Sequence, residues 1–208
     1  MARIPRIDRE ETLSAVRQRL LDAAALEFAL KGFADANINR ISLAAGFSKG
    51  TVYNYFPSKQ ALALSLVAEA GGAHVAYIAC QVTEDSNPAR RLERFFESGF
   101  RYVEDHPAQA RFLITTLYGA EIELREAMGR AYLPLFDLLA REVITPGVAQ
   151  GLFRPVDPQA MAVLLMTLYL GTSSQVDQNG KAFLDPRLAA DFALHALLQP
   201  DSAQTLGR

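Results

Sequence analysis

The chain of 208 residues has a single cysteine, Cys80, and only three histidines. One cysteine excludes an intrachain disulfide framework and any zinc cluster built from several cysteines. The histidines, His74, His106 and His195, stand far apart, and none belongs to a His-x-x-x-His or Glu-x-x-His pair. Di-iron helix bundles need two such Glu-x-x-His pairs. We therefore expect no metal site and no cofactor.

The sequence also lacks an excess of positive charge. Its 21 Lys and Arg residues stand against 23 Asp and Glu, for a net charge of −2, which excludes a polycation that coats nucleic acid everywhere. No apolar signal core follows the charges of residues 1–6. We therefore expect a protein of the reducing cytoplasm, in which Cys80 is a small buried apolar residue rather than an oxidation sensor.

The charges that are present are unevenly distributed. Residues 1–60 hold nine Lys and Arg against six Asp and Glu, whereas the remaining residues hold twelve against seventeen. A basic N-terminal segment followed by an acidic remainder is typical of a protein that binds a polyanion through one end.

One uncharged stretch is long enough to raise the question of a membrane span. No charge occurs between Asp157 and Asp177, a gap of nineteen residues. Polar residues such as Gln159 and Thr167 interrupt it, and it lacks basic or aromatic flanks. These features favour a helix packed on all sides by protein, and we expect no membrane partner.

Helical periodicity dominates the chain, and no convincing strand alternation occurs. Half of the residues are apolar, which is too many for a disordered protein and enough for a real core. The pattern predicts an all-α fold of about nine helices, the seventh of them kinked at Pro134. The expected helices cover approximately residues 9–31, 37–45, 49–55, 58–80, 92–106, 108–119, 121–145, 158–176 and 185–199. Polar residues suited to capping helix starts are Asn37, Ser48, Asp157 and Asp185, and Gly32 is expected to end the first helix. The helix over residues 92–106 has an apolar face at Leu92, Phe95, Phe96, Phe100 and Val103, and a loop is expected over residues 147–156.

Residues 38–59 carry the most informative pattern, two short helices joined by a turn at Gly46. Glycine permits the positive φ that such a sharp turn needs, and the pattern is typical of a helix-turn-helix. Apolar residues hold the two helices together, namely Ile41, Ala45, Phe47, Val52 and Phe56. The opposite face of the second helix has no acidic residue and presents Lys49, Gly50, Thr51, Tyr53 and Asn54. An acid-free polar face is what a helix inserted into the DNA major groove requires.

The run AAGFSKGTVYNYFPSK (residues 44–59) closely resembles the DNA-binding domain of the tetracycline-repressor (TetR) family. With the preceding LLDAAALEFALKGF (residues 20–33), the resemblance covers about residues 10–65. It implies a helix-turn-helix domain over residues 1–57 and a helical effector-binding and dimerisation domain over residues 58–208. The DNA-binding residues that it implies are Asn39, Lys49, Gly50, Thr51, Tyr53, Asn54, Tyr55 and Lys59, with Tyr55 and Lys59 on phosphate.

Three positions depart from the family pattern. Ala36 stands where threonine is common, which leaves helix capping to Asn37. Leu43 replaces a residue that is often charged, and Phe47 replaces a smaller valine. Upstream, the N-terminal arginines Arg3, Arg6 and Arg9 form either a DNA-contacting arm or a solvated tail.

For the larger domain the resemblance implies a homodimer formed through the last two helices and a pocket for a small, largely apolar effector. The interface residues that we expect are Leu168, Gly171, Thr172, Gln175, Leu188, Phe192 and His195. The aromatic residues that we expect at the effector are Phe96, Phe100, Phe112, Tyr118, Tyr132, Phe136 and Tyr169.

The sequence thus predicts a ligand-responsive transcriptional repressor that binds a pseudo-palindromic operator in double-stranded DNA as a dimer and is not an enzyme. Two alternatives stay open: an activator of the same DNA-binding class, and a helical enzyme or carrier that uses the cavity of the larger domain. The second alternative lacks a nucleophile–base pair, metal-ligand spacing and a phosphate loop.

Overall fold

The computed structural model describes residues 6–175 and 182–199, with side chains from Leu13 onward. The described chain forms two compact units. The first unit comprises Met1–Ala70 and Ala108–Met128, and the second comprises Gly71–Pro107 and Gly129–Arg208. The division into residues 1–57 and 58–208 stays a prediction, since it concerns function rather than compactness.

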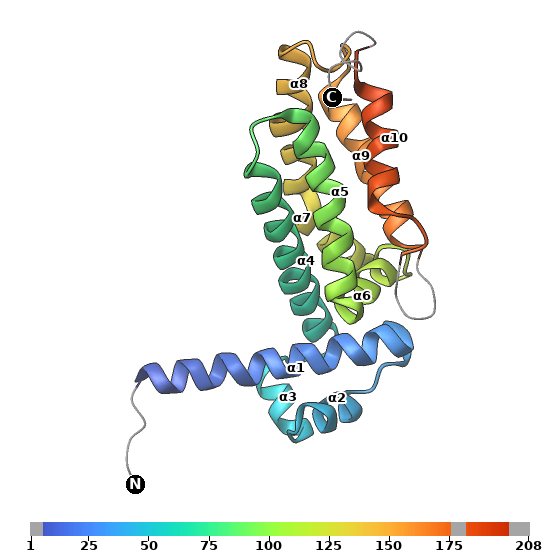
Figure 1. Cartoon of the computed structure of the whole chain (residues 1–208). Helices are drawn as coiled ribbons and strands as arrows, with labels where there is room; N and C mark the ends of the chain where they lie inside the picture. The colour runs from blue at the N-terminus through green and yellow to red at the C-terminus, as the bar shows by residue number, and fades with distance from the viewer. Residues whose placement is uncertain (1–5, 176–181, 200–208) are drawn as a thin grey trace. The chain divides into compact units, whose positions relative to one another are not determined.

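The all-α prediction is confirmed, because the described residues contain helices and no strand (Figure 1). The helix α7, the π-helical turn η1 and α8 follow one another without a break. When this run is counted as one helix, the described residues contain nine helices, as predicted. The first unit holds α1 (Arg6–Asp35), α2 (Ile38–Ala45), α3 (Lys49–Tyr55), the beginning of α4 (Lys59–Thr83), all of α6 (Pro107–Leu117) after its first residue, and the beginning of α7 (Ile122–Leu138).

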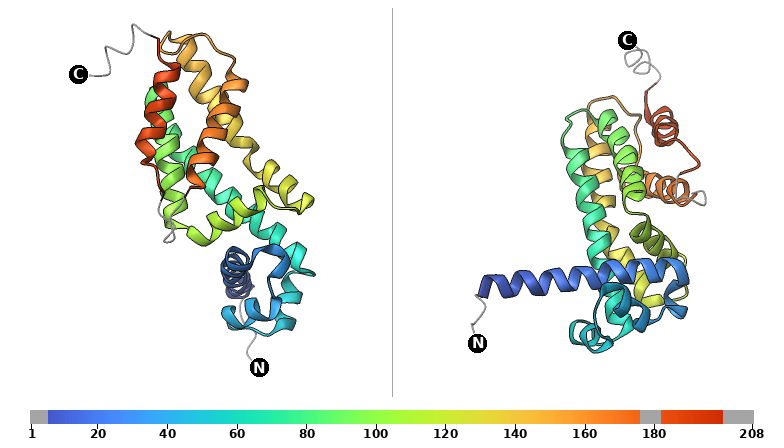
Figure 2. Two further views of the ribbon diagram at one scale, coloured as in Figure 1. Left: turned by 90° about the vertical axis from the view of Figure 1, so that its right-hand side faces the viewer. Right: turned by 60° about the horizontal axis from the view of Figure 1, so that its bottom comes forward.

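The second unit is a helical bundle in which α5 and α10 lie side by side and α9 packs against both (Figures 1 and 2). It holds the rest of α4 and α7, together with α5 (Pro88–Asp105), η1 (Leu139–Ile144), α8 (Thr145–Ala149), α9 (Pro158–Ser173) and α10 (Pro186–Leu197).

Several helices begin at the polar cap residues that the sequence predicts. The side chains of Asn37, Ser48, Asp157 and Asp185 each accept a hydrogen bond from a backbone N–H in the first turn of α2, α3, α9 and α10, respectively. These bonds satisfy amide groups that have no partner within the helix. At the other end of α1, Gly32 adopts a φ of 73° and stops the regular helix, as the sequence predicts.

The predicted seventh helix continues further than expected. It runs through Pro134, widens into η1 and ends with α8 at Ala149. Pro146 explains the wide turn, because its ring nitrogen has no hydrogen for the carbonyl of Glu142, four residues earlier, and its ring would clash with that carbonyl. The freed carbonyl of Glu142 accepts instead from Arg91 of α5, at 2.6 Å. The expected loop at Gly147 therefore begins only after Ala149.

Buried aromatic side chains from α5 and the loop after α8 fill the second unit. The predicted apolar face of α5 is buried throughout, at Leu92, Phe95, Phe96, Phe100 and Val103. Phe153 is fully buried and lies directly against Gly147 of α8. A Cβ at position 147 would lie 2.0 Å from its ring, so only glycine fits there.

One described helix, α4, is long and apolar enough by length and composition to cross a membrane. Half of its apolar window is buried within the protein, which is the pattern of a core helix.

Replacing Gly147 by alanine should destabilise the protein by about 1–3 kcal/mol, because the added methyl overpacks a fully buried ring. Urea denaturation measures the effect. Gly72→Ala is the matched control, since a Cβ there meets no atom within 4 Å and alanine favours helix by up to ~1 kcal/mol. Adding Phe153→Leu to Gly147→Ala should recover part of the loss. Equal stability of the two alanine variants would contradict the packing argument.

Candidate functional site

The α2–turn–α3 segment is held from within by buried apolar residues. Ile41 and Ala45 of α2 and Val52 of α3 are almost fully buried, as is Phe56 after α3. Gly46 has a φ of 77°, and its N–H donates to the carbonyl of Leu43 at 3.0 Å. The turn is therefore closed tightly enough to bring α3 back against α2, as a helix-turn-helix requires.

The outward face of α3 is polar and free of carboxylates. Lys49, Gly50, Tyr53 and Asn54 are exposed, whereas Thr51 is half-buried. The Lys49 ammonium lies 5.9 Å from the centre of the Tyr53 ring, one helical turn later, which holds both side chains at one edge. The five residues that the sequence predicts for this face are thus brought together on one surface of the first unit.

The hydroxyl groups at the start of α3 are already paired with each other. Ser48 Oγ lies 2.9 Å from Thr51 Oγ1 and accepts from the Thr51 backbone N–H at 3.1 Å. Positively polarised amides and a hydroxyl pair at a helix start suit a phosphate oxygen as well as a base edge.

The other three predicted DNA-binding residues lie around this face. Asn39 is exposed on α2, and Tyr55 is half-buried with its ring beside that of Phe56. Lys59, at the start of α4, is already engaged within the first unit. Its ammonium donates to the carbonyl of Ala34 at 2.8 Å and to that of Ala36 at 3.2 Å. The phosphate contact of Lys59 stays a prediction, and any such contact shares the ammonium with these carbonyls.

A buried carboxylate that the sequence analysis missed fixes the start of α2. Glu27 of α1 is 8% exposed and accepts a hydrogen bond from the Asn37 N–H at 3.2 Å. The Arg40 guanidinium lies 3.6 Å from its other oxygen. Nothing in the local sequence signals this role, because Glu27 and Asn37 are ten residues apart and belong to different helices.

The second unit holds a buried polar cluster centred on His74 of α4, which is 4% exposed. Its Nδ1 lies 2.7 Å from the Tyr132 hydroxyl and its Nε2 lies 3.0 Å from the Tyr169 hydroxyl. A neutral imidazole has one donor and one acceptor nitrogen, so one tyrosine donates to the ring and the other accepts from it. The ring of Tyr102 stacks on the imidazole at a centroid distance of 4.4 Å.

The pKa values of this cluster keep it uncharged at neutral pH. Burial lowers the pKa of His74 from its ordinary value of 6.5 to about 4, against a smaller opposing effect of the Gly99 backbone. Burial also raises the pKa of both Tyr132 and Tyr169 above its ordinary value. Gly99 of α5 leaves room for the Tyr169 ring, since a Cβ there would lie 2.6 Å from it.

The structure brings only some of the predicted effector residues to this cluster. Phe96, Phe100, Tyr132 and Tyr169 are buried in the second unit, where both phenylalanine rings contact Tyr169 edge-on. Phe136, on α7, is half-buried. Phe112 and Tyr118 do not join them, because both belong to the first unit. There Phe112 stacks on Phe28 at 5.2 Å, and Tyr118 is 70% exposed.

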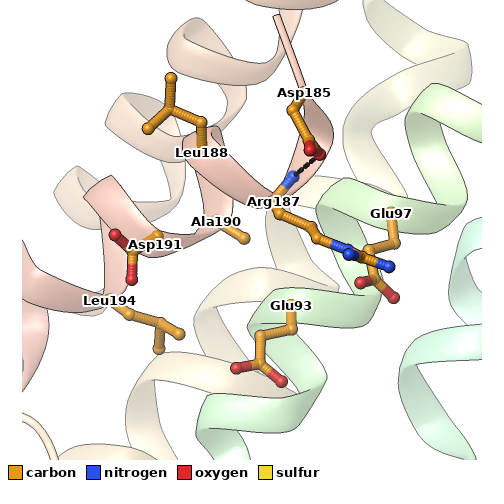
Figure 3. Close-up of a pocket in the computed structure, with 8 residues that line it drawn as sticks. All are labelled: Glu93, Glu97, Asp185, Arg187, Leu188, Ala190, Asp191 and Leu194. Atoms are coloured by element: carbon orange, nitrogen blue, oxygen red, sulfur yellow. Dashed lines mark hydrogen bonds between the residues drawn. The ribbon is translucent and has the colours of Figure 1, made fainter.

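An open groove of about 500 Å³ lies between α5 and α10 (Figure 3). Four carboxylates line it, those of Glu93, Glu97, Asp185 and Asp191. The side chain of Arg187 extends across it toward Glu97 (Figure 3). The surplus of negative charge repels phosphate, so this surface is unsuited to DNA.

The predicted interface residues lie on a partly apolar surface of α9 and α10. Gly171, Gln175, Leu188, Phe192 and His195 are exposed, whereas Leu168 and Thr172 are half-buried. Val163 and Leu164 of α9 add exposed apolar area. Exposed apolar side chains at this density are typical of a surface that another protein covers.

Cys80 is exposed on α4, so the expectation that it is buried was wrong. It lies on the solvent-facing side of an apolar helix, where local sequence gives no clear signal. The described residues contain no group of three or more potential metal ligands.

Lowering the pH from 6.5 to 4 should destabilise the protein through His74. The unfolded chain binds the proton at a pKa of 6.5 and the folded chain only at about 4, so stability is lost across this window, by roughly 3 kcal/mol in all. His74→Gln retains a donor and an acceptor without titrating, and it should lose this part of the pH dependence in urea denaturation. His195→Gln removes an exposed imidazole as the control. Parallel stability curves for His74→Gln and the unchanged protein would contradict a buried neutral imidazole.

Comparison with known proteins gives a consistent result. Residues 20–66 match the family described as "Bacterial regulatory proteins, tetR family". The transcriptional regulator EthR of Mycolicibacterium smegmatis is 34% identical over half of this chain and 45% of its own length. RutR of Escherichia coli strain K12 is 27% identical over 76% of this chain and 73% of its own.

Among solved structures, AibR in complex with isovaleryl coenzyme A and operator DNA superposes with a TM-score of 0.71 at 20% identity. The match covers 88% of this chain and 98% of AibR, and at this identity it establishes the fold. Residues 20–66, which include the helix pair, thus match the TetR family of bacterial regulatory proteins, and the all-α fold and these relatives agree with that match.

Proposed function

We propose that this chain is a cytoplasmic, dimeric repressor that inserts α3 into the major groove of an operator duplex and leaves the DNA when a small effector binds. The observation that carries the proposal is the outward face of α3, which is acid-free and polar and which a fully buried inner face holds in place. Such a helix offers donors to base edges without repelling phosphate. The relatives EthR and RutR are likewise named as transcriptional regulators rather than enzymes.

In this proposal the role of each DNA-binding residue depends on its position. Lys49, Gly50, Thr51 and Tyr53 of α3 face the bases and the adjoining backbone, and these four residues form the reading face. Asn39, Asn54, Tyr55 and Lys59 flank them and lie against phosphates. Phosphate contacts fix the register and base contacts read the sequence, so loss of the first group changes specificity more than loss of the second.

Two copies of α3 have to reach successive major grooves, about 34–36 Å apart. A two-fold dimer through α9 and α10 provides this arrangement, because an isologous interface uses the same surface on both subunits. The exposed apolar residues Val163, Leu164, Leu188 and Phe192 support this choice of surface.

The effector site that we propose lies in the second unit, around the ring cluster of Phe96, Phe100, Tyr132, Phe136 and Tyr169. These side chains offer aromatic faces and hydroxyl groups without a full charge, which suits a largely apolar molecule with few polar groups. AibR, with the same fold, was crystallised with isovaleryl coenzyme A. In the present chain, the phenylalanine rings of the cluster favour an effector that has an apolar portion, as the isovaleryl group does.

Effector and operator then act on one equilibrium between two states. The chain passes between the two units at Ala70–Gly71, at Pro107–Ala108 and at Met128–Gly129, so α4, the start of α6 and α7 are the covalent routes of coupling. An effector shifts the equilibrium only by its differential affinity for the two states, typically ~1–3 kcal/mol.

Lys49→Ala and Tyr53→Ala should each weaken binding to a duplex selected from a random-sequence pool, because each removes a contact of the reading face. We expect a loss of ~1–3 kcal/mol, or roughly 5- to 150-fold in Kd, with the thermal unfolding unchanged. Fluorescence anisotropy at several salt concentrations measures it. Matched controls are Lys31→Ala and Tyr118→Ala, which remove the same side-chain types from exposed positions of the first unit outside α3.

The same titration tests Lys59. Lys59→Ala should lower the slope of log K against log salt by about 0.9 if the ammonium also neutralises a phosphate. An unchanged slope would show that Lys59 does not neutralise a phosphate.

Wild-type affinity for both Lys49→Ala and Tyr53→Ala, with the two controls behaving alike, would refute the assignment of α3 as the helix that reads the bases.

Phe192→Glu should convert the dimer into monomers, since it places a charge on a side chain that is 66% exposed in the single chain and apolar in the proposed interface. Sedimentation velocity measures the change in mass, and operator affinity should fall with it. Leu133→Glu, at a similarly exposed position of α7, is the control. A dimeric Phe192→Glu variant would place the subunit interface elsewhere.

A further inference from the structure

Arg19 of α1 reaches the turn between α2 and α3 and contacts it in two ways. Its Nη2 donates to the carbonyl of Ala45, the last residue of α2, at 2.8 Å. Its guanidinium carbon lies 4.8 Å from the centre of the Phe47 ring. One planar cation therefore covers both the end of α2 and the residue that follows Gly46.

The guanidinium also occupies the space that a side chain at position 46 would need. A Cβ on Gly46 would lie 2.9 Å from Nη2, and the φ of 77° disfavours any other residue there. The glycine of this turn is thus matched to Arg19 as well as to the backbone conformation.

The end of α2 depends on help from outside the helix. The last carbonyls of a helix have no partner within it, and α2 has no basic residue in its last turn. A helix of eight residues is marginal by itself. Arg19 supplies from α1 the donor and the positive charge that α2 lacks.

We infer that Arg19 is a positioning residue for DNA recognition: by clamping Ala45 and Phe47 it sets the direction in which α3 leaves the turn. Ser48, the cap of α3, directly follows Phe47, and Lys49 is the next residue. A change in the turn is therefore passed at once to the residues of the reading face.

The same construction occurs a second time in the first unit, which supports a structural role for the contacts of Arg19. Gly32, with a φ of 73°, ends the regular part of α1 and is followed by Phe33. The Lys59 ammonium lies 4.9 Å from the centre of the Phe33 ring and donates to the carbonyls of Ala34 and Ala36. At both Gly–Phe turns a cation from a neighbouring helix covers the ring and binds a carbonyl.

The test compares Arg19→Met with Lys31→Met, which removes the same charge from an exposed position of α1. The first readout is hydrogen exchange of the free protein. The N–H groups of Gly46 and Phe47 donate within the turn, at 3.0 and 2.8 Å. They should exchange at least about tenfold faster in Arg19→Met, since a charged hydrogen bond is lost, and at the same rate in Lys31→Met. Unchanged exchange in Arg19→Met would overturn the clamp.

The second readout is DNA binding to a duplex selected from a random-sequence pool. Arg19→Met should lose about tenfold in affinity for that duplex, with little change for a scrambled one and an unchanged salt slope. A direct phosphate contact would instead lower the slope by about 0.9 and weaken both duplexes alike, and that result would overturn the positioning role.

Two further variants test the chemistry of the clamp. Arg19→Lys keeps the charge but not the planar fork or its stacking, so it should remain impaired. Full recovery by lysine would overturn the argument from stacking. Phe47→Leu combined with Arg19→Met should be no worse than Arg19→Met alone, because the two residues act as one unit; additive losses would show that they act separately.

This inference rests on the proposed DNA binding by α3, and the two readouts separate their failures. If the wild-type chain selects no duplex, the proposed function fails, while hydrogen exchange on the free protein still tests the clamp. If the duplex binds and exchange is unaffected by Arg19→Met, the clamp fails and the proposed function stands.

Discussion

The backbone groups at the two ends of α2 need hydrogen-bond partners from outside that helix. The helix α2 has eight residues and α3 has seven, and neither has a basic residue in its last turn. Glu27 and Arg19 of α1 therefore hold the two ends of α2, one accepting from the amide of Asn37 and the other donating to the carbonyl of Ala45. The long helix α1 thus holds the helix-turn-helix in place, and the orientation of the outward face of α3 depends on these contacts.

The second unit meets the opposite demand, since it places polar groups within an apolar core. His74, Tyr132 and Tyr169 come from α4, α7 and α9 and satisfy one another through two hydrogen bonds. Buried polar groups cost stability unless all are paired, and a fully paired network specifies one arrangement of the helices that contribute to it. The neutral imidazole is central to this arrangement, because its two nitrogens join two hydroxyl groups on different helices without burying a charge.

The sequence predicts most of what depends on neighbouring residues and little of what depends on distant ones. The caps at Asn37, Ser48, Asp157 and Asp185 follow from residues two or three positions away, and each is confirmed. The contacts of Arg19 with Ala45 and of Lys59 with Ala34 span 26 and 25 residues, and no local pattern signals them. For the same reason the aromatic content of the chain does not separate Phe112, which packs on Phe28, from Tyr132, which lies at His74. Pro146 was visible in the sequence, but only the position of Arg91 explains how the helix continues past it.

In the first unit, the residues that orient α3 are different from those on its outward face. This separation explains how a regulator of this kind can change its operator without losing its fold. Val52 and the apolar residues of α2 hold α3 from inside, and Arg19 and Ser48 fix its start. Lys49, Tyr53 and Asn54 project outward and are not needed for any of these contacts. Because the groups that orient α3 differ from those that face the DNA, substitutions on the reading face alter recognition at little cost in stability. Substitutions at the turn, by contrast, displace every reading residue at once.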